Sequence, residues 1–219
     1  MTLALFDLDH TLLAGDSDVL WCDLLLARGI LDSGFAQRNA DIDAQYRAGT
    51  VDPIVFANFY LSTLAGRTPQ QWEPLRQQFL REEIVLRIPR AAIELVQRHQ
   101  AAGDLVVMTT ATNRFLTELT ADYLQIEHLI ATEPEIVDGV FSGRTTGVLN
   151  MRAGKVTRLH AWLRGRGTKL EQFQSTGYSD SINDLPLLET VNVPVAVNAD
   201  PKLAEVAAQR GWKTLSLLC

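Results

Sequence analysis

The sequence has few cysteines, no long apolar stretch and no excess of positive charge, and each shortage excludes a class of protein. Cys22 and Cys219 are the only cysteines among 219 residues, too few for a disulfide framework or a cysteine-rich metal centre. No apolar run approaches the ~20 residues that span a bilayer, and the residues before Asp7 do not resemble a signal peptide. A formal net charge of -6 argues against general nucleic-acid binding. We therefore expect a soluble, cytoplasmic protein that binds neither membranes nor nucleic acids.

What the sequence does contain is an alternation of short apolar runs with helical patterns. The runs at residues 3–6, 105–108, 129–131, 174–178 and 193–197 predict strands. Helical patterns cover residues 89–102, 113–123 and 153–166, and a last helix opens at Asp200-Pro201 and ends near Gly211. This alternation predicts a Rossmann-like α/β fold, in which a mostly parallel sheet binds ligands beyond the carboxyl ends of its strands.

Residues 14–86 interrupt the alternation with several consecutive helical patterns, at 18–28, 35–48, 53–64 and from Thr68-Pro69 onward. Thr68 suits the N-cap and Pro69 the first helical position, and Pro74 is tolerable near the start of that helix. We therefore predict a helical cap domain, 14–86, inserted into a core domain formed by 1–13 and 87–219. A Gly-, Thr- and Val-rich segment at 133–148 predicts a β-hairpin with a structural role.

Two carboxylates two residues apart follow the first predicted strand, in Asp7-Leu8-Asp9-His10-Thr11. Asp7 suits a nucleophile that attacks phosphorus, and Asp9 can then protonate the leaving oxygen and deprotonate a water. Taken alone, the pair is equally typical of a solvated acidic turn after a strand. The motifs that follow it along the chain favour a phosphoryl-transfer site.

A second acidic cluster, Asp180 to Asp184, follows the fourth predicted strand. Carboxylate oxygens suit Mg²⁺, so Asp180 would bind the metal with Asp7, while Asp184, with Asn183 beside it, would support the ligands and waters around the ion. The alternative is a structural one, because Asn183 and Asp184 precede the apolar run at 185–188 and would cap a helix there.

Two weaker signals lie between the acidic motifs. The run at 108–112 follows the second strand, and we expect Thr110 and the neighbouring Ala111 to hold phosphate oxygens, with Thr109 and Thr112 as alternatives to Thr110. Lys155 heads the helix before the fourth strand and could neutralise both nucleophile and phosphate. A lone lysine is usually solvated, so its position between the other motifs is what supports this role.

Taken in order, these segments resemble the haloacid dehalogenase superfamily of phosphatases, and the inserted helices resemble its phosphoserine phosphatase-like subgroup. The resemblance implies a Mg²⁺-dependent phosphomonoesterase with Asp7 as nucleophile, Asp9 as acid and base with its backbone carbonyl on the metal, and Asp180 as metal ligand. It also places Thr110 and Lys155 on phosphate and makes Asp184 a supporting carboxylate. Two departures are Ser181, where the subgroup often has Gly, and Thr110-Ala111-Thr112 in place of Ser-Gly-Gly.

The same resemblance bears on the substrate, a small phosphomonoester. In phosphoserine phosphatases an acid nine residues after the nucleophile meets the substrate's amino group, and here that position is Asp16. A cap arginine holds the substrate carboxylate in those enzymes, but an ungapped match places Tyr60 there, with Arg47 or Arg67 as substitutes if the alignment shifts. Because tyrosine lacks the charge and fork of arginine, we expect an amino-alcohol phosphate such as histidinol phosphate rather than phosphoserine.

Asp16, Ser17, Asp18 and Trp21 follow the first motif closely and are candidates for the pocket wall. The structural alternative is equally open, because Asp16 to Asp18 also suits the N-cap of a helix and Trp21 suits the core of the cap. The alternative functions are a phosphoserine phosphatase and, second, a phosphotransferase or a catalytically silent phosphate-binding protein. The sequence leaves monomer and homodimer open.

Overall fold

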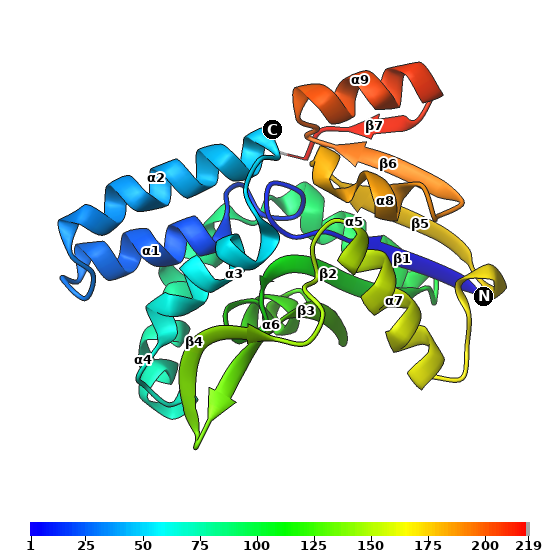
Figure 1. Cartoon of the computed structure of the whole chain (residues 1–219). Coiled ribbons are helices and arrows are strands. Elements are labelled where there is room, and N and C mark those ends of the chain that lie inside the picture. The colour runs from blue at the N-terminus through cyan, green and yellow to red at the C-terminus, as the bar shows by residue number, and fades with distance from the viewer. Residues whose placement is uncertain (218–219) are drawn as a thin grey trace.

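The structure is a computed structural model that describes residues 1–217, apart from the side chain of Arg47, so Cys219 lies outside the described residues (Figure 1). Within that range seven strands form one sheet in the order β4-β3-β2-β1-β5-β6-β7. Neighbouring strands are parallel apart from the antiparallel pair β3 and β4. The bounds are β1 (Thr2–Phe6), β2 (Leu105–Asn113), β3 (His128–Val137), β4 (Val140–Thr146), β5 (Gln174–Ser179), β6 (Val193–Val197) and β7 (Lys213–Leu215). The predicted α/β fold is confirmed.

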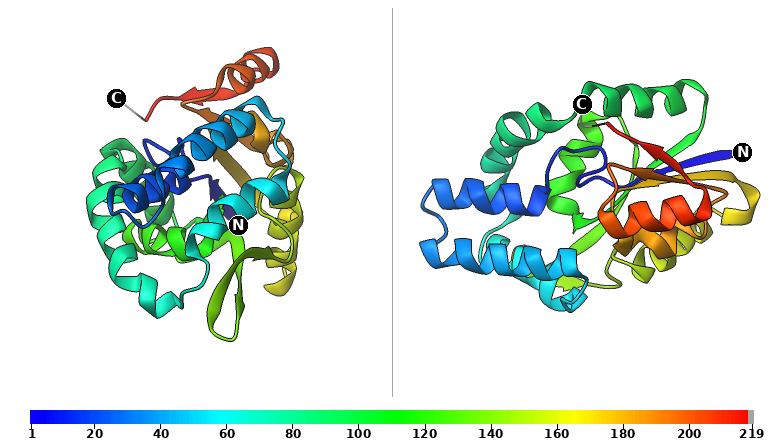
Figure 2. Two further views of the ribbon diagram at one scale, coloured as in Figure 1. Left: turned by 60° about the vertical axis from the view of Figure 1, so that its left-hand side comes forward. Right: turned by 90° about the horizontal axis from the view of Figure 1, so that it is seen from above.

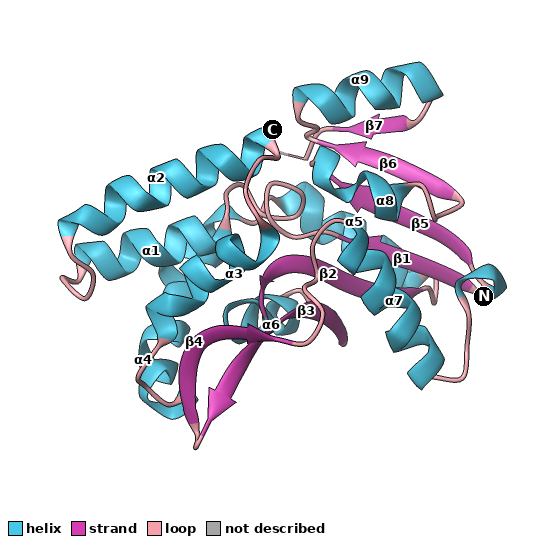
Figure 3. Ribbon diagram, viewed as in Figure 1, coloured by secondary structure: helices cyan, strands magenta, loops and turns pink. Residues whose placement is uncertain are grey.

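Helices cover both faces of the sheet, because alternate side chains of each buried strand face opposite ways. Leu3 and Leu5 pack toward α7 (Ala153–Gly165) and α8 (Leu185–Leu188), whereas Ala4 and Phe6 face the cluster that includes α5 (Arg90–Ala101) and α6 (Arg114–Tyr123). Figure 3 shows the strands between these two helical layers. The last helix, α9 (Pro201–Arg210), packs beside β6 and β7.

The helices predicted in residues 14–86 are confirmed, and they gather beyond the carboxyl end of β1 (Figure 1). They are α1 (Ser17–Ala27), α2 (Ser33–Ala48), α3 (Pro53–Leu61) and α4 (Pro69–Phe79), followed by a π-turn at Leu80–Ile84. The hydroxyl of Thr68 accepts from the N–H of Gln71, whose side chain accepts from the N–H of Thr68, which completes a capping box. Figure 2 shows α1 and α2 side by side. The division into core and cap domains stays a prediction.

The hairpin of β3 and β4 matches the one expected at 133–148, and it attaches to the helical segment. Backbone hydrogen bonds join Phe141 to Gly66 and to Arg67, both at 3.0 Å. Two strand features differ from expectation: β2 extends to Asn113, and β7 was not predicted. A three-residue exposed edge strand carries too little apolar pattern to be recognised. Within residues 1–217, no helix combines the length and apolar character needed to cross a membrane.

Candidate active site

Asp7, Lys155 and Asp184 form the buried centre of the site. Asp7 directly follows β1, and its N–H donates to the carbonyl of Tyr178 at 3.0 Å. The ammonium of Lys155 donates to Oδ1 of Asp7 at 2.7 Å and to Oδ2 of Asp184 at 2.6 Å. Gly154, in the first turn of α7 (Ala153–Gly165), allows the carbonyl of Leu149 to approach closely, because a Cβ there would collide with that oxygen. The sequence motifs of three separate segments therefore converge on one ammonium group.

Thr11 joins the first acidic motif to the last, although no role was predicted for it from the sequence. Its hydroxyl accepts from the backbone N–H of Asp180 at 3.0 Å, across 169 residues of chain. The same oxygen lies 3.0 Å from Oδ2 of Asp7 and 3.3 Å from Oδ1 of Asp180, so its one proton is donated to one of the two carboxylates. The signal in the sequence that could have indicated this role is the position of Thr11, four residues after Asp7 in the same loop.

The side chain of Asp184 does not cap the helix that follows it. Asp184 precedes α8, yet its carboxylate makes no cap hydrogen bond and instead accepts from Ser179 Oγ at 2.8 Å and from Lys155. Ser181 caps the short turn at Ile182–Asp184, with its oxygen 3.2 Å from the N–H of Asn183. The capping alternative therefore does not explain Asp184.

Asp9 is held by hydroxyl groups on both of its oxygens. Oδ1 accepts from the N–H of Ser17 at 2.7 Å and from its hydroxyl at 2.6 Å, and Oδ2 lies 3.0 Å from Thr112 Oγ1 and 3.3 Å from Thr110 Oγ1. Thr110 is fully buried and its hydroxyl also accepts from the N–H of Thr112. The pocket is lined by Ala111 and Thr112 at this point, not by Thr110.

Negative charge exceeds positive charge at the centre. Burial raises the pKa of Asp7 to about 7, despite the opposing ammonium of Lys155. Burial, together with repulsion from Asp7 and Asp184, raises the pKa of Asp180 to about 9. For Lys155, burial alone would lower the pKa, but Asp184 and Asp7 outweigh it and the pKa is raised. The ammonium of Lys155 therefore stays charged at neutral pH. It does not by itself balance the carboxylates of Asp7, Asp180 and Asp184.

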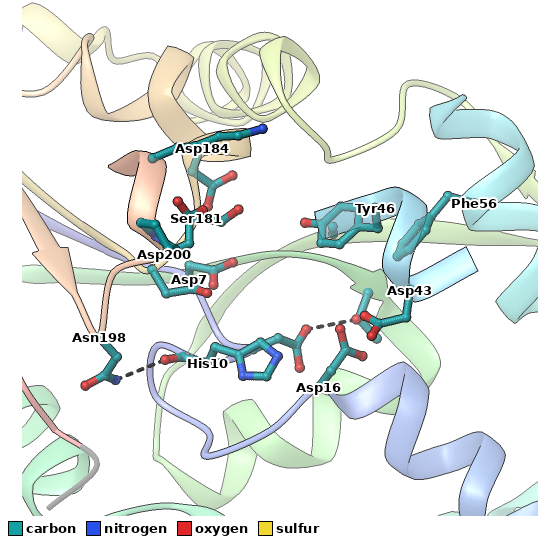
Figure 4. A pocket seen from close by; sticks show the side chains of 16 residues that line it. Asp7, His10, Asp16, Asp43, Tyr46, Phe56, Ser181, Asp184, Asn198 and Asp200 are labelled. Carbon is teal, nitrogen blue, oxygen red and sulfur yellow. Dashed lines mark hydrogen bonds between the residues drawn. The ribbon is translucent and has the colours of Figure 1, made fainter. Parts of the chain in front are cut away.

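A cavity of about 460 Å³ opens onto these carboxylates (Figure 4). Asp7 and Asp184 lie toward one end, and Asp16 and Asp43 bring their carboxylates together at the other. Beside the second pair, the rings of Tyr46 and Phe56 stack with centroids 4.5 Å apart. Asp16 also caps α1, accepting from the N–H groups of Asp18 and Val19, and burial with repulsion from Asp9 and Asp43 raises its pKa to about 8.

Other residues expected near the substrate lie elsewhere. Trp21 is buried against Trp72 and Phe79 and donates to Thr63 Oγ1. It therefore belongs to the core of the inserted helices, which was the structural alternative for this residue. Tyr60 is buried and does not line the cavity. Arg67 stacks over Trp72 at 4.4 Å, and the side chain of Arg47 lies outside the described structure.

The lining residues that were not predicted from the sequence include Asp43, Tyr46 and Phe56. They come from α2 and α3, whose apolar patterns do not indicate which face turns toward the sheet. The aromatic pair at 46 and 56 was visible in the sequence, but nothing local connects it with Asp7.

Comparison with known proteins gives consistent matches over nearly the whole chain. The family model for haloacid dehalogenase-like hydrolases matches residues 4–189. A histidinol-phosphatase from Neisseria meningitidis is 37% identical over 217 residues, covering 98% of both chains. A phosphoserine phosphatase from Mycobacterium tuberculosis is 32% identical, covering 96% of this chain and 69% of its own.

Solved structures agree with the sequence comparison. A protein with unknown function from Bordetella pertussis Tohama I has a TM-score of 0.94 and 43% identity, covering 99% of this chain and 100% of that one. A phospho-aspartyl intermediate analogue of phosphoserine phosphatase has a TM-score of 0.72 at 17% identity, covering 98% of this chain and 92% of that one. The second likeness concerns the fold alone.

Proposed function

Because this chain belongs to the haloacid dehalogenase-like hydrolase family and is a phosphatase, we propose that it is a Mg²⁺-dependent phosphomonoesterase acting on an amino-alcohol phosphate, with histidinol phosphate as the leading candidate. The observation that carries the proposal is the contact of Lys155 with Asp7 and Asp184, beside a cavity whose far end is acidic and aromatic. The residues proposed for catalysis and those proposed for substrate recognition thus lie toward separate ends of one cavity.

The reaction follows from the two carboxylates of the first motif. Asp7 attacks phosphorus, the bond from phosphorus to the ester oxygen breaks, and Asp9 gives its proton to the leaving oxygen. Asp9 then takes a proton from water, whose oxygen attacks the aspartyl-phosphate and releases inorganic phosphate with Asp7 restored. Lys155 stabilises the negative charge on Asp7 and on the phosphoryl oxygens throughout.

The residues present fit a magnesium ion. Asp7 and Asp180 offer hard oxygen ligands that Thr11 holds close to each other. The backbone carbonyl of Asp9 would be the third donor. Within residues 1–217, no group of three His, Cys, Asp or Glu side chains is arranged to hold a metal ion by itself. When bound, the ion would supply the positive charge that the carboxylates and phosphate require.

The recognition end supports a substrate with an ammonium group and a flat ring. Asp16 and Asp43 present carboxylates to an amine, and Tyr46 and Phe56 present aromatic surface to a ring such as imidazole. No arginine of the described side chains lines the cavity, and Lys202, a lining cation, has its ammonium 3.4 Å from the carbonyl of Ala48. Among the described side chains, which leave out that of Arg47, a bidentate clamp for the carboxylate of phosphoserine is therefore missing.

A phosphate-release assay tests the proposal. Purified protein with Mg²⁺ is assayed on histidinol phosphate, ethanolamine phosphate, phosphoserine and p-nitrophenyl phosphate, with EDTA as the control. We expect the highest kcat/KM for histidinol phosphate and loss of turnover in EDTA that added Mg²⁺ restores. Turnover of phosphoserine well above the two amino-alcohol phosphates would contradict the substrate assignment. Transfer of phosphate to added alcohols in preference to water would favour a phosphotransferase.

A further inference from the structure

The hydroxyl of Thr112 lies between two carboxyl groups. Its oxygen is 3.0 Å from Oδ2 of Asp9 and 3.0 Å from Oδ2 of Asp18. Asp18 is not among the residues to which the proposed reaction assigns a role. A hydroxyl carries one proton, so Thr112 donates to one of the two carboxyl groups and accepts from the other. At least one carboxyl group must therefore carry a proton of its own, and when Asp9 is the carboxylate left after proton transfer that group is Asp18.

The surroundings of Asp18 identify it as the protonated group. Asp18 is only 4% exposed, its Oδ1 is buried without a hydrogen-bond partner, and it forms no ion pair with any described side chain. A buried carboxylate with one hydrogen bond and no cation is costly, whereas a neutral carboxylic acid is tolerated. Burial, and then the charges of Asp16 and Asp9, also raise the pKa of Asp18 well above its usual range.

The remaining titratable groups around Asp18 offer no positive charge either. Its own helix presents Cys22, whose pKa is raised by burial and by Asp18, and α3 presents Tyr60, whose pKa burial, Asp16 and Asp18 raise. Both groups are therefore neutral at neutral pH. Asp9 faces Asp18 from the loop after β1, through Thr112.

With a neutral Asp18, every hydrogen bond around Asp9 has one direction. Asp18 donates to Thr112, Thr112 donates to Oδ2 of Asp9, and the N–H and hydroxyl of Ser17 donate to Oδ1. An ionised Asp18 would compete for the single proton of Thr112 and leave two oxygens facing each other at 3.0 Å. The hydrogen bond from Thr112 to Asp9 therefore depends on a donor at residue 18.

We propose that Asp18 is a positioning residue, a neutral carboxylic acid that orients the hydroxyl of Thr112 toward Asp9 and so stabilises the carboxylate left after proton transfer. The inference rests on the proposed function, in which Asp9 protonates the leaving oxygen. Stabilising the Asp9 carboxylate raises the rate most for leaving groups that cannot depart without a proton, such as an alkoxide.

The same region also permits a purely structural role, since Asp18 stands in the first turn of α1, where a negative charge favours the helix dipole. That role would affect folding stability and all substrates equally. It would also require an ionised carboxylate, whereas the side chain is buried against Thr112. Leaving-group dependence therefore separates the two roles.

The test compares kcat on histidinol phosphate, an alkyl ester, with kcat on p-nitrophenyl phosphate, whose leaving group departs without protonation. Asp18→Leu removes the donor at nearly constant volume, and Thr112→Val removes the bridging hydroxyl. We expect each to lower kcat on the alkyl ester by about 10- to 100-fold more than it lowers kcat on the aryl ester. Melting temperatures establish that the variants are folded.

The conservative variants provide the matched controls. The amide of Asp18→Asn can donate to Thr112, and Thr112→Ser keeps the hydroxyl, so both should hold the alkyl-to-aryl ratio within about threefold of wild type. If Asp18→Leu does not fold, the contrast of Thr112→Val with Thr112→Ser carries the test. Equal losses on both esters, no loss on either, or an Asn variant that behaves like Leu overturns the proposal. A wild type inactive on every ester contradicts the proposed function itself.

Discussion

The guanidinium of Arg152 donates from Nη2 to the carbonyl of Gly49 at 3.1 Å, joining segments 103 residues apart. Its Nε also donates to Oδ1 of Asn183 at 3.2 Å, in the loop that carries Asp180 and Asp184. Gly49 caps the C-terminus of α2, where carbonyl oxygens lack helical partners and carry partial negative charge. Arg152 thus connects the helix that presents Asp43 and Tyr46 with the segment just before Lys155.

We expect Arg152→Ala to lower kcat/KM for histidinol phosphate by about 5- to 20-fold, which corresponds to one or two charge-assisted hydrogen bonds. The melting temperature should change little, since the contacts are near the surface. Steady-state kinetics with thermal melts measure both effects. Arg164→Ala, on the exposed side of α7, is the control and should retain wild-type kinetics. A kinetic effect no larger than that control would show that the contact has no role in turnover.

Asp16→Asn should raise KM for histidinol phosphate by about 10-fold or more, because a charge-assisted hydrogen bond to the ammonium is lost. KM for p-nitrophenyl phosphate, which has no amine, should stay near the wild-type value. Stability should be preserved, since asparagine caps a helix as well as aspartate does. Asp52→Asn is the matched control, because Asp52 caps α3 through the N–H groups of Ile54 and Val55 outside the cavity. Equal effects on both substrates would remove the recognition role of Asp16.

Mg²⁺ should stabilise the wild-type protein against heat, by about 2.7 kcal/mol at a concentration 100 times its Kd. Asp180→Asn should lose most of this stabilisation because it removes a proposed ligand. Without metal it should melt no lower than wild type, since repulsion among Asp7, Asp180 and Asp184 is relieved. Thermal melts with Mg²⁺ and with EDTA measure the difference, and the exposed Asp122→Asn serves as control. An unchanged Mg²⁺ shift in Asp180→Asn would exclude Asp180 as a ligand.

Replacing Asp7 with asparagine should abolish turnover, by about 10³-fold or more, because an amide is not a competent nucleophile. The substitution keeps the shape of the side chain and removes a buried charge, so the fold should persist. Phosphate release and circular dichroism of the same preparation check both statements. Residual turnover within tenfold of wild type would assign the nucleophile to another residue.

Glu133 links Arg114 and Arg158, and its effect on stability should depend on pH. Burial alone would raise the pKa of Glu133, but hydrogen bonds from Arg114 and Arg158 hold it below its usual value. A lowered carboxyl pKa stabilises the fold above the ordinary value near 4.5 and loses that effect as pH falls through the folded value. Glu133→Gln should therefore cost about 1–2 kcal/mol at neutral pH and less in acid.

Urea unfolding of wild type and Glu133→Gln at neutral and acid pH measures this dependence. Glu94→Gln is the control, because Glu94 pairs with the exposed Arg90 and should contribute less than about 1 kcal/mol at either pH. A difference for Glu133→Gln that is constant, or that grows in acid, would show that the ionised carboxylate is not the source of stability.

The sequence by itself determined the elements whose signals are local. The alternation of short apolar runs with helical patterns predicted the α/β fold. Consecutive helical patterns, with the Thr68-Pro69 start of α4, predicted the inserted helices. The acidic pair at the end of β1 was likewise recognisable, because carboxylates at strand ends gather at one edge of a parallel sheet. These features depend on residues within a few positions of each other.

Only the tertiary structure decided which side chains share a surface. Thr11 meets Asp180 across 169 residues, and Thr112 meets Asp18 across 94, through packing that no local pattern encodes. Each inserted helix has several polar and apolar faces. The rotation of α1 that buries Trp21, and the rotation of α2 that turns Tyr46 to the cavity, therefore depend on the elements packed around them. Burial then sets the charge state of each carboxyl group, which composition alone does not fix.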